Sequence, residues 1–214
     1  MRNPLVEKVL TREEQDKLTP DEVIKMLKQG NRNFVSDTLT SRDHSMQVRA
    51  ATNGQYPIAI VLSCVDSRVP VEDVFDRGIG DIFVARVAGN FANTDILGSM
   101  EYACKVSGSK LVLVLGHEYC GAIKSAIDGV DLGNITPMLE NIKPALDHFT
   151  EYTGDRTSQN DEYVHMVSEQ NVRITIEYIR QNSPILKEME QKAEIKIVGA
   201  MYDMDTAVVS FYEH

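Results

Sequence analysis

Four short apolar runs separated by longer amphipathic stretches set the pattern of this chain. Apolar runs of this length are typical of strands buried on both faces, whereas apolar residues at helical spacing predict the segments between them as helices. The predicted strands are 57–62, 81–87, 110–116 and 195–200. The predicted helices are 96–106, 120–127, 137–149 and 163–185, and 150–162 is predicted as a mobile loop. Strands that alternate with helices indicate an α/β fold with a mostly parallel central sheet flanked by helices.

A helical segment precedes the first predicted strand. Thr19 can cap a helix that begins at Pro20 and runs towards Gly30. An isolated amphipathic helix needs a surface to pack against, and a second subunit is one candidate. We therefore divide the chain into an N-terminal helical arm, residues 1–56, and an α/β domain, residues 57–214, within a single domain overall.

Composition narrows the class of partner and the compartment. The formal net charge of -10 disfavours nucleic acid, because phosphate backbones are held chiefly by Lys and Arg. No apolar run is long enough to span a bilayer, and the first residues lack the apolar stretch of a secretory signal. We expect a cytoplasmic protein, or a periplasmic one if a signal has been removed. The 3 cysteines make an odd count, which favours reduced thiols, metal ligands or buried apolar side chains over disulfides.

Unusual residues follow the first and the third predicted strand, at the sheet edge where sites gather in this fold class. The first strand leads into Cys64, and the third leads into His117 and Cys120. Two thiolates and one imidazole suit zinc. Three protein ligands with an open fourth position are typical of catalytic rather than structural zinc.

Asp66 and Arg68 lie on the same strand-end loop as Cys64. A carboxylate paired with a guanidinium stays ionised and oriented, so Asp66 could accept a hydrogen bond from a zinc-bound hydroxide. The plainer interpretation is that the cysteines are small buried apolar residues and that the Asp–Arg pair is a solvated ion pair of little energetic value. The residues alone leave both interpretations open.

At this point the chain resembles a known family. The segments 64–68 and 116–121 resemble the two signatures of the β-class carbonic anhydrases, and the resemblance extends through 86–90 and 98–103. It covers most of the chain from about Leu18 onwards. It implies a zinc lyase that reversibly hydrates carbon dioxide to bicarbonate and a proton by a zinc-bound hydroxide, which an Asp–Arg dyad orients.

The resemblance also assigns residues and partners. It implies one Zn²⁺ per chain, carbon dioxide or bicarbonate as the small-molecule substrate, and a homo-oligomer, dimer or tetramer, in which the N-terminal arm wraps a partner. It places Cys64, His117 and Cys120 as metal ligands and Asp66 with Arg68 as the catalytic dyad. It places the following residues in the substrate pocket: Gln55, Phe83, Ala88, Tyr102 and Gly121.

Two departures from the family pattern bear on the site. The family members whose aspartate closes onto zinc carry a tryptophan shortly before the first cysteine, whereas this chain has Val61 there and no Trp at all. The resemblance therefore implies the open form, with water as fourth ligand and Asp66 held by Arg68. Val87 stands where many members have Asn, which puts the hydrogen bonds around Arg86 in question.

The sequence leaves open other functions for the metal site and the identity of the residue that carries the released proton. The same metal site could favour carbon disulfide or carbonyl sulfide, serve as a silent zinc scaffold, or bind bicarbonate as a sensor. We expect Cys104 to be part of the core. A histidine outside the ligand set could carry the released proton, and the chain offers His44, His148, His165 and His214.

Overall fold

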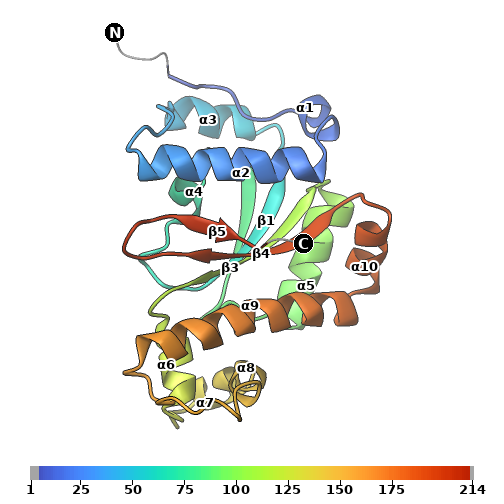
Figure 1. Ribbon diagram of the computed structural model, residues 1–214. Coiled ribbons are helices and arrows are strands. Elements are labelled where there is room, and N and C mark those ends of the chain that lie inside the picture. The colour runs from blue at the N-terminus through green and yellow to red at the C-terminus, as the bar shows by residue number, and fades with distance from the viewer. Residues whose placement is uncertain (1–4, 213–214) are drawn as a thin grey trace.

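A five-stranded sheet with the order β2-β1-β3-β4-β5 forms the centre of the molecule (Figure 1). The computed structural model describes residues 5–212. The strands are β1 (Ala59–Ser63), β2 (Ile82–Arg86), β3 (Leu111–His117), β4 (Lys196–Tyr202) and β5 (Val209–Phe211). The first four strands are parallel, and β5 is antiparallel to β4. The four predicted strands and the mostly parallel α/β architecture are confirmed.

Helices cover both faces of the sheet (Figure 1). In the N-terminal part they are α1 (Arg12–Asp16), α2 (Pro20–Val35), α3 (His44–Ala51) and α4 (Val71–Val74). The middle of the chain forms α5 (Thr94–Glu101), a π-helical turn η1 (Tyr102–Val106), α6 (Gly121–Ile127), α7 (Ile135–Leu139) and α8 (Lys143–Asp147). The last two are α9 (Asp161–Asn182) and α10 (Pro184–Gln191). Within residues 5–212, no helix combines the length and the apolar character that crossing a bilayer requires.

The helix α2 packs against the sheet of its own chain. Val23 and Leu27 are fully buried in a cluster that also contains Val61 of β1 and Leu113 of β3. The apolar face of this helix is therefore already covered without a second subunit. Whether other parts of the arm wrap a partner, and whether 56 is a domain boundary, stay predictions.

Gly30 lies inside α2, which continues five residues beyond the predicted end to Val35. A Cβ atom on Gly30 would lie 1.8 Å from the carbonyl oxygen of Phe75, at the end of α4. The glycine is thus explained by close packing of the helix on the neighbouring backbone rather than by a helix end.

Two of the predicted helices are each divided in two. The predicted helix 163–185 ends at Asn182 because Ser183, with φ -121° and ψ 93°, is extended and precedes Pro184, which begins α10. The predicted helix 137–149 is interrupted at residues 140–142, and Pro144, in the first turn of α8, lacks the amide that would continue the hydrogen bonds of one long helix. No helix or strand spans residues 150–160, in agreement with the predicted loop, whose mobility stays a prediction.

Candidate active site

Three soft or borderline ligands come together at the carboxyl end of the parallel strands. Cys64 directly follows β1, His117 is the last residue of β3, and Cys120 caps α6. All three are at least 97% buried, and one ligand atom from each lies within 4.8 Å of the others. Strand register explains the approach, because Ser63 at the end of β1 lies beside Leu115 of β3.

The geometry of this cluster fits zinc. The two Sγ atoms of Cys64 and Cys120 lie 3.9 Å apart, and two sulfurs bonded tetrahedrally to one zinc at about 2.3 Å would lie about 3.8 Å apart. The Nδ1 atom of His117 lies 2.8 Å from the carbonyl oxygen of Glu118, to which it can donate. The buried Nε2 atom of His117 has no hydrogen-bond partner and is left with a free lone pair. The sulfurs and this ring nitrogen are a donor set that zinc prefers.

The two thiols have divergent acidities. The pKa of Cys64 is lowered to about 4, chiefly by a hydrogen bond from Cys120, with smaller contributions from the neighbouring His117 and the Gly89 amide, against the effect of burial. The Cys64 thiolate in turn raises the pKa of Cys120. One sulfur is therefore a thiolate at neutral pH, and a bound divalent cation would supply the charge needed to ionise the second.

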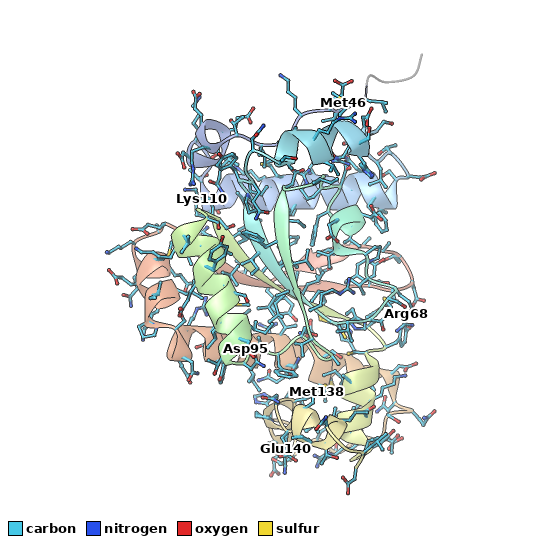
Figure 2. All side chains as sticks on the ribbon, turned by 180° about the vertical axis from the view of Figure 1, so that it is seen from behind. Met46, Arg68, Asp95, Lys110, Met138 and Glu140 are labelled. Atoms are coloured by element: carbon cyan, nitrogen blue, oxygen red, sulfur yellow. The ribbon has the colours of Figure 1, made fainter. Side chains whose placement is uncertain are left out.

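Asp66 and Arg68 form a bidentate ion pair next to this cluster. Arg68 donates from Nε to Asp66 Oδ1 at 2.9 Å and from Nη2 to Asp66 Oδ2 at 2.8 Å. These hydrogen bonds lower the pKa of Asp66 to about 2, although burial raises it. The same Oδ2 atom lies 4.0 Å from Nε2 of His117, so the charged carboxylate faces the candidate metal centre. Figure 2 labels Arg68 at the edge of the molecule, in agreement with its 54% exposed side chain.

The loop that carries the dyad is held from the neighbouring strand. Arg86 at the end of β2 donates to the carbonyl oxygens of Cys64 at 2.9 Å and of Asp66 at 2.6 Å. The Gly89 amide lies 3.4 Å from the Cys64 sulfur, and its carbonyl accepts from the buried Asn171 of α9 at 2.8 Å. The hydrogen bonds of Arg86 are thus present although Val87 replaces the usual Asn. No local pattern pointed to Asn171, which lies far along the chain.

The predicted pocket residues divide between two places: Gly121 directly follows Cys120 and Ala88 directly precedes Gly89 beside the cluster, whereas Phe83 and Tyr102 lie in a separate cavity. Phe83 and Tyr102, whose ring centroids are 6.2 Å apart, line a cavity of about 660 Å³ between β2 and α5, with Asp95 labelled at the start of α5 in Figure 2. Neither Asp66 nor any of the three candidate ligands, all of them among the described residues, lines this cavity. Gln55 and Gly121 are exposed, and Ala88 is half-buried. The pocket assignments stay predictions.

The glycines beside the ligands have different explanations. Gly116 allows close packing, because a Cβ there would lie 2.5 Å from the Met201 sulfur and 2.6 Å from Val172. A Cβ on Gly121 would meet open space, so no neighbouring atom requires a glycine there. The residue that makes the tight turn is Tyr119, with φ +53°.

The remaining candidates fall outside the cluster. Cys104 is 3% exposed in the core, where burial raises the pKa of its thiol to about 12, which confirms the core prediction. His165 on α9 lies with Nδ1 3.4 Å from a carboxylate oxygen of Glu118, the residue after the ligand His117. His44 begins α3, His148 packs against Phe149, and His214 lies outside the described residues.

Solved structures of similar fold include β-carbonic anhydrases of fungi and of Coccomyxa. A β-carbonic anhydrase of Aspergillus fumigatus matches with a TM-score of 0.71 over 90% of both chains at 22% identity. A tetrameric β-carbonic anhydrase of Sordaria macrospora matches with a TM-score of 0.68 over 91% of this chain and 93% of that one, at 22% identity. A Coccomyxa β-carbonic anhydrase matches with a TM-score of 0.67, covering 89% of this chain and 82% of that chain at 20% identity. At these identities the likeness shows the fold.

Sequence comparison gives the family. Carbonic anhydrase 2 of Mycobacterium tuberculosis is 32% identical over 198 residues, which cover 89% of this chain and 91% of the relative. A carbonic anhydrase of Mycolicibacterium smegmatis is also 32% identical over 198 residues, or 89% and 92% of the two chains. The carbonic anhydrase family profile matches residues 59–209, which include all three candidate ligands and the dyad. With its β-class structural neighbours, this chain therefore belongs to the β-carbonic anhydrases, the lyases that hydrate carbon dioxide.

Proposed function

We propose that the chain hydrates carbon dioxide with a zinc ion held by Cys64, His117 and Cys120, and that Asp66 and Arg68 orient the reacting water. The observation that carries this proposal is the buried two-sulfur, one-imidazole cluster, whose unpartnered Nε2 lies 4.0 Å from an ion-paired carboxylate. Zinc bound there would act as a Lewis acid that lowers the pKa of water to about 7. The protein's own side chains would orient the reacting water.

Asp66 is the hydrogen-bond acceptor in this mechanism. Its low pKa keeps the carboxyl ionised across the neutral range, so it can only accept a hydrogen bond from the attacking water. Arg68 fixes the orientation of both carboxylate oxygens, and Arg86 fixes the backbone on either side of them. A fixed acceptor removes part of the orientational cost of bringing water and carbon dioxide together.

We further propose the open form of the site. The two hydrogen bonds between Asp66 and Arg68 favour a carboxylate that stays on the guanidinium and leaves the fourth position of the metal free of protein ligands. The fork of the guanidinium matches both carboxylate oxygens, and moving Asp66 onto the metal would break this match. The absence of Trp from the chain, with Val61 at the family's tryptophan position, supports the same form.

We also propose that the chain forms a homo-oligomer, a dimer or a tetramer. One structural neighbour is described as tetrameric. Among the described residues, the arm carries six of the fifteen exposed large hydrophobic side chains: Leu5, Val6, Val35, Leu39, Met46 and Val48. Figure 2 labels Met46 on the outer side of the arm. The half-buried strand β2 at the sheet edge, with Tyr102 53% exposed nearby, offers a second apolar surface.

The test of the proposed function is stopped-flow hydration of carbon dioxide by zinc-loaded protein between about pH 6.5 and about pH 9, the range that spans a zinc-water titration near pH 7. We expect a smooth rise of the rate with pH, loss of activity after chelation, and recovery on adding zinc. Cys120→Ser, which removes one ligand, should lose both zinc and activity. Activity that appears only at the alkaline end would contradict the open form.

Parallel assays separate the rival functions. A clear preference for carbon disulfide or carbonyl sulfide would replace the carbon dioxide assignment within the same site. Saturable bicarbonate binding without turnover would indicate a sensor. Zinc binding with neither turnover nor bicarbonate binding would leave a silent scaffold.

A further inference from the structure

The hairpin formed by β4 and β5 contacts the loop that carries two of the three candidate ligands. This ligand loop is residues 117–120. The Glu118 amide donates to the carbonyl of Tyr202 at 3.1 Å, which extends the pairing of β3 and β4 by one bond. The Met204 amide, in the hairpin turn, donates to a carboxylate oxygen of Glu118 at 3.3 Å. The hairpin thus binds the ligand loop through both main chain and side chain.

Tyr119 occupies the least favourable position in this loop. Its φ of +53° lies in the left-handed region, which side chains other than glycine rarely adopt. Such a conformation persists where the surroundings hold it, and it lets His117 and Cys120 approach one centre across only two intervening residues. The hydroxyl of Tyr119 donates to Asp205 Oδ2 at 3.0 Å, and the Lys124 ammonium lies 5.6 Å from its ring centroid.

The backbone of Tyr119 also reaches the dyad. Its carbonyl oxygen lies 3.4 Å from Nη2 of Arg68, the nitrogen that also bonds Asp66 Oδ2. A rotation of the Tyr119 peptide would therefore move the Cys120 backbone and remove an acceptor from Arg68 together. The position of one side chain is coupled in this way to a metal ligand and to the dyad.

We propose that Tyr119 is a positioning residue, whose hydroxyl bond to Asp205 in the β4–β5 turn holds the ligand loop in its metal-binding conformation. This rests on the proposed function only in taking the Cys64–His117–Cys120 cluster as a metal site. Tyr119 is half-buried and Asp205 is exposed, so water competes for the bond and its effect is smaller than that of a ligand. The effect appears as faster loss of metal rather than as loss of the fold.

The experiment compares zinc release to an excess of a chromophoric chelator from the zinc-loaded wild type, Tyr119→Phe, Asp205→Ala and the double variant. Both single variants should release zinc faster, by up to about tenfold, the low end of what outer-shell partners contribute to metal sites. The double variant should be no faster than the faster single variant, because both changes remove the same bond. Tyr178→Phe is the matched control, a hydroxyl removed from a 39% exposed tyrosine on α9.

Release rates equal to those of the wild type in both single variants would overturn the proposal. So would additive effects in the double variant, or a lower melting temperature without faster release. If a variant were unstable, the absorption spectrum of the cobalt-substituted protein would report the ligand geometry directly, and an unchanged spectrum in Tyr119→Phe would also count against the proposal. Zinc release can be measured whether or not the protein is catalytically active. A protein that binds zinc but does not hydrate carbon dioxide would therefore contradict the proposed function, and the role of Tyr119 could still be tested.

Discussion

Among residues 5–212, two Asp–Arg pairs of the same chemistry lie in opposite surroundings. In the pair Asp66–Arg68 the side chains are 15% and 54% exposed, whereas in the pair Asp76–Arg42 they are 1% and 11% exposed. The first pair is local, because its two residues are 2 positions apart in the sequence. The second joins the N-terminal arm to the turn after α4 across 34 positions of sequence.

The two carboxylates differ in how much of their hydrogen-bond acceptor capacity is already used within the protein. The oxygens of Asp76 accept from Asn33, Thr40 and Arg42, and Arg42 donates also to the main-chain carbonyl of Asp76. That carboxylate is fully used inside the protein and fixes the arm on the sheet domain. Asp66 accepts only from Arg68 among the described residues and faces His117, so its free capacity points to the candidate metal centre. An Asp–Arg pair that is buried and saturated can serve only structure, whereas the pair with free acceptor capacity is the one for which we propose a chemical role.

The largest expected effect is on stability, from Asp76→Ala. The substitution leaves Arg42 buried without its counter-charge, which typically costs about 3–5 kcal/mol in the free energy of unfolding. Urea unfolding of the zinc-loaded protein measures it, with Asp147→Ala, an exposed carboxylate, expected within about 0.5 kcal/mol of the wild type. Folded Asp76→Ala should keep its hydration rate per zinc. A variant as stable as the wild type would show that the buried pair does not anchor the arm.

The next effect is on activity, from Asp66→Asn. The amide cannot reproduce the charged acceptor or the bidentate pair with Arg68, so kcat/KM for hydration should fall about 100-fold, equivalent to about 2.7 kcal/mol in the activation free energy. The free energy of unfolding should change by less than about 1 kcal/mol, because the partly exposed pair contributes little to stability. Zinc content is measured alongside. Activity within twofold of the wild type would remove Asp66 from the mechanism.

The smallest effect is the pH dependence of stability. Burial raises the pKa of Asp76, but hydrogen bonds from Asn33, Arg42 and Thr40 outweigh it and hold the pKa below the ordinary 3.8. The stability that this carboxylate contributes is therefore present above pH 3.8 and is lost as the pH falls through the lower folded value. Below pH 3.8, stability of the wild type should fall more steeply than that of Asp76→Asn, by at most about 1.4 kcal/mol per pH unit. Protonation of the metal ligands affects both proteins and cancels in the difference. Parallel slopes would contradict the shifted pKa.

Local sequence patterns predicted the elements that carry the site. β1 and β3 are buried along their whole length, and such strands give the continuous apolar runs that predicted them. The cap at Thr19 predicted the start of α2 correctly, because a cap depends on residues within one turn. The three-residue edge strand β5 and the short helix α4 were not predicted, since neither is long enough to show a period.

The sequence by itself determined the parallel sheet, the strand ends that carry Cys64 and His117, and the pairing of Asp66 with Arg68. These features depend on the pattern of apolar residues within a strand and on residues that are neighbours in the sequence. Only the tertiary structure decided which distant side chains meet. It paired Arg42 with Asp76, brought Asp205 to Tyr119, and placed Phe83 in a cavity away from the ligands. Contacts of this kind depend on how packed helices and strands bring together side chains that are far apart in the sequence. No local pattern of residues specifies which of these distant side chains will be in contact.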